Sequence, residues 1–162
     1  KYTWQEAGSS YLPGELIAAF LWAQLEEGES ITATRLQLWQ TYHALLAPLE
    51  EQGFLRRPIV PPGCRHNAHM YYVLLSPEFD GEKCIQSMKR EGVMPVFHYV
   101  PLHSSPAGQK VARANGSLAV TEDLAYRLLR LPLWVGMDAT MVEFVSRSLR
   151  DSLNKQRHGK TL

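Results

Sequence analysis

The chain has 162 residues, of which 45% are hydrophobic and 20% are charged, as is typical of one globular domain with a substantial core. It carries 17 Lys and Arg against 16 Asp and Glu, and this near balance argues against nucleic acid or an anionic membrane as a partner. Cys64 and Cys84 lack the spacing of a metal or redox motif, so we interpret them as reduced thiols in a cytosolic protein.

Residues 1–29 are predicted to form a linker segment followed by one helix. The first residues show neither a signal-peptide pattern nor an initiator methionine, so we expect the chain to be part of a longer one. Pro13 suits the first position of a helix, and residues 16–25 are apolar nearly all the way round it. Such a helix is buried on most sides, inside a larger body or a dimer interface. It is too short to span a bilayer, which needs roughly 20 residues.

The start of this helix has two readings. It follows Ser9 and Ser10, and small hydroxyl residues before a helix suit a phosphate held by free N–H groups. Plain N-capping is the commoner use of such residues, and both readings stay open.

Residues 30–154 are predicted to form a small α/β domain that begins with an amphipathic helix. Ser30 is a plausible cap, and apolar residues follow it at spacings of three and four. Trp39 and Tyr42 lie on this stripe, and we interpret them as core residues rather than a ligand platform. Pro48 is expected to break the helix.

The rest of the chain alternates between strand and helix patterns. We expect strands at 70–75 and 93–99, a loop at 104–120, an edge strand at 131–134, helices capped by Asp80, Thr121 and Asp138, and a solvated, frayed basic tail at 155–162. This order of elements predicts an α/β layer.

The strand at 93–99 ends in a group of titratable residues. Apolar strands that deliver polar groups at one end often present a site, and His98, Tyr99 and His103 stand at this end. They could equally be ordinary satisfied residues. Two histidines five apart suit separate contacts to a polar ligand better than a shared metal, while His66 and His69 have no evident partner. No P-loop, dinucleotide fingerprint, nucleophile elbow or zinc spacing is present.

Several segments, in order, resemble the C-terminal part of the PLP-dependent nucleotide-sugar aminotransferases. They are GSSYLP at 8–13, LWAQL at 21–25, NAHM at 67–70, FHYVPLH at 97–103, PAG at 106–108 and RLLRLPL at 127–133. Within that family they are most similar to the subgroup of dTDP-4-amino-4,6-dideoxygalactose transaminases.

The resemblance implies fold type I, in which a large domain holds pyridoxal 5'-phosphate (PLP) on a lysine. A smaller C-terminal domain of α+β type, with a short, mostly antiparallel sheet packed with helices, closes the site. We therefore expect the large domain upstream of residue 1 and no catalytic residue in this chain, because none of its lysines stands in the family's lysine motif.

The resemblance also implies site residues. Many family members have an asparagine at position 10, which contacts the cofactor phosphate of the partner subunit, and an arginine at position 12. This chain has Ser10 and Leu12, so Ser10 is the expected cofactor contact and the role of the arginine is absent. His98, Tyr99 and His103 are expected to bind the substrate or shape its site.

The expected partners are a dTDP-linked 4-keto-6-deoxy sugar, glutamate as amino donor, and a second copy of the chain in a homodimer. Two alternatives stay open from the sequence. One is a non-catalytic module for sugar-nucleotide binding or dimerisation, and the other is a related enzyme that uses PLP for dehydration.

Overall fold

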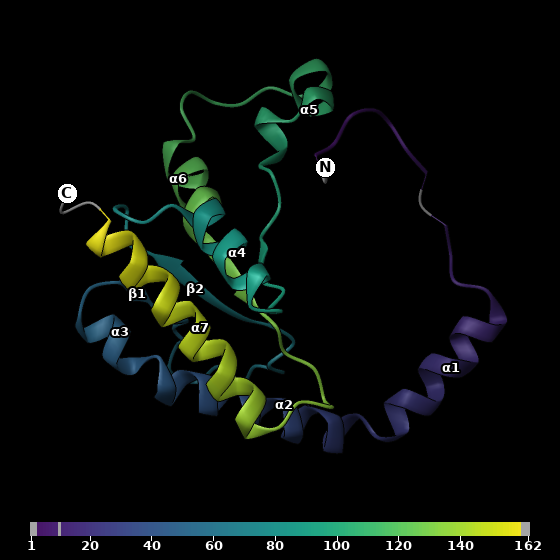
Figure 1. Ribbon diagram of the computed structural model, residues 1–162. Helices are drawn as coiled ribbons and strands as arrows, with labels where there is room; N and C mark the ends of the chain where they lie inside the picture. Colours follow the sequence, from purple (N-terminus) through teal and green to yellow (C-terminus); the bar gives the residue numbers. More distant parts are fainter. Residues whose placement is uncertain (1–2, 10, 160–162) are drawn as a thin grey trace.

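The computed structural model describes residues 3–9 and 11–159. Figure 1 shows one helix, α1, standing apart at the N-terminal side, while the remaining elements gather around a sheet. Helix α1 spans Glu15–Glu26 and follows Gly14, so Pro13 precedes the helix and the prediction that it opens it was wrong. Helix α2 spans Gly28–Leu45 and starts earlier than the predicted Ser30, because the Glu27 carbonyl already accepts the first helical hydrogen bond.

The predicted break at Pro48 is confirmed. Helix α2 ends at Leu45, and the short helix α3 (Ala47–Glu51) carries Pro48 in its first turn, where proline needs no N–H donor. Trp39 and Tyr42 of α2 are buried, as predicted for core residues. The hydroxyl of Tyr42 donates to the carbonyl of Pro132 at 2.8 Å, so this buried phenol has a partner.

Four short strands form one antiparallel sheet, which confirms the predicted mixed fold. They are β1 (Leu55–Arg56), β2 (Tyr71–Leu75), β3 (Val96–Phe97) and β4 (Leu128–Leu131), in the spatial order β1-β2-β4-β3. Strand β4 is therefore central, although it is the last in sequence. Strand β3 lies at the edge and is exposed, so the prediction of a long, buried strand at 93–99 was wrong.

Helices α5 and α6 and strand β4 differ from the prediction. A 3₁₀ turn, η1 (Leu102–Ser104), and helix α5 (Pro106–Val111) interrupt the expected loop. Helix α6 spans Ala119–Arg127, so Thr121 lies inside it rather than at its cap. Residues 128–131 pair with β2 as β4, and this strand ends before Pro132, which has no N–H for a ladder.

Two further helices complete the domain, α4 (Gly81–Arg90) and α7 (Ala139–His158). Asp80 and Asp138 cap them as predicted: their carboxylates accept from the backbone N–H groups of Lys83 and Met141. Helix α7 continues to His158, so the expected fraying from Lys155 was wrong for that part of the tail. Among the described residues, no helix is long and apolar enough to cross a membrane.

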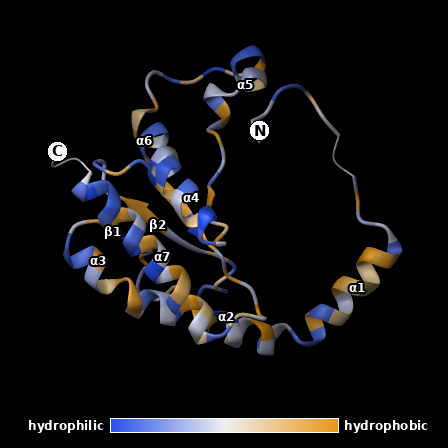
Figure 2. Cartoon of the chain, viewed as in Figure 1, coloured by the Kyte–Doolittle hydropathy of each residue, from blue (hydrophilic) through white to orange (hydrophobic). Residues whose placement is uncertain are grey.

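The core lies between the sheet and helices α2, α4 and α7. It contains large side chains that are almost fully buried, among them Tyr42, Phe54, Tyr71, Leu75, Met88, Leu129, Leu149 and Leu153. Helix α1 contributes nothing to this core, since none of its residues is buried. Figure 2 shows apolar residues along α1 where no other element covers them.

Candidate functional site

The candidate site begins where the chain leaves β3. Strand β3 pairs with β4 at Val96 and Phe97, and the chain then turns away because Tyr99 has a φ of 59°. This left-handed conformation is uncommon for a residue with a side chain and cannot continue a strand. Strain of this kind concentrates at functional sites. The local backbone thus ends the strand and presents His98 and Tyr99 beside the sheet edge.

His98 is half-buried and has an unsatisfied ring nitrogen. Its ring lies 4.9 Å from that of Tyr99, and its Nδ1 atom is buried with no hydrogen-bond partner among the described residues. Burial lowers the pKa of His98, and the positive charge of Arg130 and a contribution from His69 lower it further. The imidazole is therefore held neutral near pH 7, and its buried Nδ1 is left without a partner among the described residues.

Tyr99 lines two hollows at the surface. Its exposed side chain lines a largely apolar cavity of about 390 Å³, together with residues of α4 and α6 that include Ile85 and Tyr126. A second hollow of about 170 Å³ is lined by Val96, Phe97, Tyr99 and Arg130. The phenol can therefore contact a ligand in either hollow.

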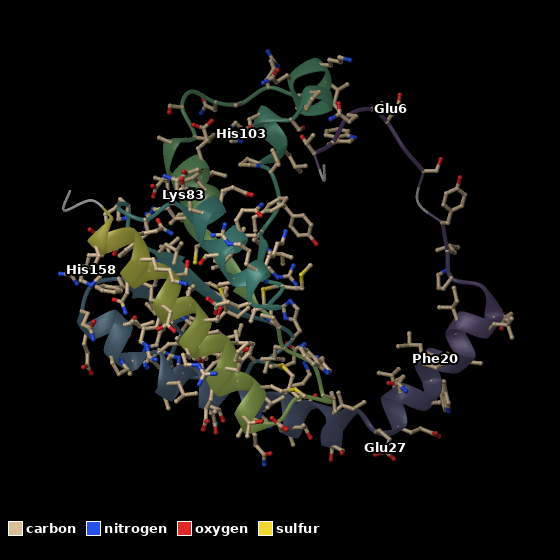
Figure 3. The ribbon with its side chains drawn as sticks, viewed as in Figure 1. Glu6, Phe20, Glu27, Lys83, His103 and His158 are labelled. Atoms are coloured by element: carbon tan, nitrogen blue, oxygen red, sulfur yellow. The ribbon has the colours of Figure 1, made fainter. Side chains whose placement is uncertain are left out.

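His103 lies apart from His98 in the 3₁₀ turn and contacts α6. Its Nε2 atom is 3.0 Å from a carboxylate oxygen of Glu122, and Glu122 lines the larger cavity. Figure 3 shows His103 at this end of the domain, far from α1. The structure therefore brings His98 and Tyr99 together, while His103 fixes the loop to α6. Substrate binding by these three residues stays a prediction, and Ser10 lies outside the described residues.

Arg130 and His69 were not among the predicted site residues, yet both lie at this edge. They line a further hollow of about 150 Å³ with Val96 and with Met70, which directly precedes β2. The signal that could have found Arg130 is the alternation in β4, where Leu129 and Leu131 are buried and Arg130 between them is not.

Comparisons with known proteins assign this chain to a family. Residues 1–150 match the DegT/DnrJ/EryC1/StrS aminotransferase family. The chain belongs to this family. Over 153 residues it is 26% identical to the dTDP-3-amino-3,4,6-trideoxy-alpha-D-glucose transaminase of Micromonospora megalomicea subsp. nigra, covering 93% of this chain and 40% of that protein. The chain thus spans well under half the length of this curated relative.

Solved structures of aminotransferases share the fold. DesV of S. venezuelae, solved in complex with a ketimine intermediate, is 25% identical and superposes with a TM-score of 0.72 over 84% of this chain and 35% of its own. PseC of Helicobacter pylori, an aminotransferase of pseudoaminic acid biosynthesis, gives a TM-score of 0.77 at 15% identity, over 93% of this chain and 40% of its own. The latter likeness shows the fold alone.

Members of this aminotransferase family depend on PLP, and the described residues fit part of such a site. Helix α1 starts at Glu15, and its N-cap residue Gly14 provides no side-chain cap, which leaves first-turn N–H groups available to a phosphate. No lysine of the described ranges lines any of the three hollows around Tyr99 and Arg130. Lys83 and Lys155 instead pair with Asp80 and Glu91 at the surface. The described residues therefore suit the phosphate of PLP but supply no lysine for its covalent attachment. No group of three or more His, Cys, Asp or Glu in the described ranges is placed to hold a metal.

Proposed function

We propose that this chain is the C-terminal domain of a PLP-dependent aminotransferase that moves an amino group from glutamate to a dTDP-linked 4-keto-6-deoxy sugar. The observation that carries the proposal is the family match over residues 1–150, supported by a relative that is a dTDP-sugar transaminase. We propose dTDP-4-amino-4,6-dideoxygalactose as the product, for cell-surface polysaccharides such as enterobacterial common antigen, made in the cytoplasm. The motifs GSSYLP and FHYVPLH support this choice.

In this proposal the chain's own residues bind and orient the substrate. Bound PLP supplies the electron sink for the amino transfer. His98, held neutral, lies beside the exposed ring of Tyr99, and the two shape the substrate site at the edge of the sheet. His103, fixed to Glu122, keeps the intervening loop in place. Ser10 contacts the cofactor phosphate.

The proposed domain organisation follows from α1. Residues 1–29 form the linker and a helix for interdomain or dimer contacts, and residues 30–154 form the small domain, followed by the basic tail of residues 155–162, of which 155–158 still belong to α7. Large apolar side chains on several sides of α1, such as Leu16, Phe20 and Trp22, are exposed here. Figure 3 shows Phe20 with no other element beside it. A homodimer and a cofactor domain outside these 162 residues would cover them, and that domain would supply the lysine.

The test supplies PLP, L-glutamate and dTDP-4-keto-6-deoxyglucose to the chain alone and to the chain joined to its cofactor domain. Formation of 2-oxoglutarate and of a dTDP-amino sugar is followed by mass spectrometry. We expect both products only from the joined protein. The proposal fails if the joined protein makes neither, and a dehydrated sugar in their place would indicate the PLP-dependent dehydratase.

A second measurement separates the non-catalytic alternative. The chain alone is treated with PLP and borohydride, and any modified lysine is mapped by mass spectrometry. We expect no stoichiometric modification at one lysine, because no lysine lines the hollows at Tyr99. A single, fully modified lysine would contradict the assignment of the lysine to another domain. Binding of dTDP sugars with no cofactor domain anywhere in the gene would favour the binding module.

A further inference from the structure

Positively charged and chargeable groups converge at the edge of the sheet beside Tyr99. Arg130 lines the 150 Å³ hollow with His69 and the 170 Å³ hollow with Tyr99, so it is common to the two. His98 interacts electrostatically with both Arg130 and His69. Neither hollow is lined by an aspartate or a glutamate. This edge therefore has a local excess of positive charge, although the whole chain is nearly neutral.

The register of the sheet explains why Arg130 is available. Its neighbours in β4, Leu129 and Leu131, are buried in the core, so Arg130 lies on the opposite face of the sheet. Its partners across the ladder are Tyr72 of β2 and Val96 of β3. Because β3 is an exposed edge strand, Arg130 and these two cross-strand partners are accessible to a ligand.

Arg130 also differs from the other half-buried arginines. Arg35 donates to the carbonyls of Ala68 and His69, and Arg127 pairs with Asp123 and donates to a carbonyl of β2. The side chain of Arg130 makes no hydrogen bond or ion pair within the described ranges 3–9 and 11–159. A guanidinium with five donors and no partner among these residues is suited to receive an anion.

We propose that Arg130, with His69 beside it, binds the diphosphate of a nucleotide-sugar substrate. The inference rests on the proposed function, which supplies the nucleotide sugar. Guanidinium groups bind phosphate oxygens in a bidentate manner. Two hollows that share one arginine suit two linked phosphates, whereas a single carboxylate would occupy one of them. The rings of Phe97 and Tyr99 line the same edge and offer apolar surface to the attached sugar or base.

The test measures binding of inorganic pyrophosphate, dTDP and L-glutamate to the chain by calorimetry. Arg130→Gln removes the guanidinium, and Arg130→Lys keeps the positive charge but loses the bidentate geometry of the guanidinium. The control Arg113→Gln removes an equal charge from an exposed segment. We expect pyrophosphate and dTDP to bind the unchanged chain. Their affinity should fall by about tenfold or more in Arg130→Gln, as for a lost charged hydrogen bond. It should fall by less in Arg130→Lys and stay unchanged in Arg113→Gln.

Three results would overturn the inference: no binding of pyrophosphate or dTDP, an equal loss in Arg113→Gln, or Arg130-dependent binding of glutamate in place of pyrophosphate. Thermal melting checks that each variant is folded. If Arg130→Gln is unfolded, binding is compared between the unchanged chain and Arg130→Lys instead. The outcomes are separable from those of the transamination assay. Arg130-dependent binding without amino transfer would remove the proposed function alone, and amino transfer without such binding would remove this inference alone.

Discussion

Helices α1 and α7 both carry large apolar side chains, but they bury them differently. In α7 the apolar residues form one stripe, and Val142, Val145, Leu149 and Leu153 are all buried against the domain. In α1 they lie on all sides, and no residue is buried. A striped helix can be covered by its own chain, whereas a helix that is apolar all round needs cover from several directions.

The comparison teaches that the two regions depend on different contacts. Residues 28–159 contain a contiguous core, so this part has what it needs for stability within itself. A lone 12-residue helix is only marginally stable in water. Helix α1 is therefore expected to gain its stability from surfaces that the described residues do not provide.

Truncating one leucine in each helix tests most directly whether α1 and α7 contribute differently to stability. Leu149→Ala in α7, where the side chain is fully buried, should lower the free energy of unfolding by about 2–5 kcal/mol, because it removes apolar contacts and leaves a cavity. The matched Leu16→Ala in α1, where 88% of the side chain is exposed, should change it by less than about 0.5 kcal/mol. Urea unfolding followed by circular dichroism measures both. Equal losses would show that α1 belongs to the same core.

Self-association tests whether α1 is covered by contacts with another copy of the chain. The exposed apolar surface of α1 should make the chain associate at micromolar concentration in analytical ultracentrifugation. Phe20→Glu should weaken this association by about tenfold, because a charge buried in an apolar contact must be desolvated. Ile59→Glu, a control at an equally exposed position in the domain, should leave association unchanged. A monomeric unchanged chain would contradict the assignment of α1 to an interface.

Local signals in the sequence predicted much of the domain correctly. The caps at Asp80 and Asp138 and the break at Pro48 depend on neighbouring residues, and the structure has all three. The central strand β4 was not predicted correctly. Its leucines extend the helical pattern of α6, and only pairing with β2, more than 50 residues earlier, makes them a strand.

Pairing between distant segments also explains which site residues were missed. His98 and Tyr99 are neighbours in the chain, so their proximity could be predicted. Arg130 and His69 reach them only because β4 lies between β2 and β3, an order that no local pattern specifies. The left-handed turn at Tyr99 was equally hidden, because it is not a residue that favours this conformation.

The smallest expected effect concerns the pKa of His98, which should rise when Arg130 is replaced by glutamine. Burial is the largest cause of the lowered pKa, followed by Arg130 and then His69, so the variant should move it only part of the way back to 6.5. His43, whose pKa is lowered by burial and by Arg57, is the internal control and should not change. Titration of the imidazole signals by NMR measures both.

The same shift fixes the direction of a stability effect. Because the pKa of His98 is lower in the folded chain, the unfolded chain takes up this proton first as the pH falls. The contribution of His98 to stability is therefore present above about pH 6.5 and is lost as the pH falls through the folded pKa. Arg130→Gln should reduce this loss, since it raises the folded pKa toward that of the unfolded chain. An unchanged His98 pKa in Arg130→Gln would show that the two groups are not coupled.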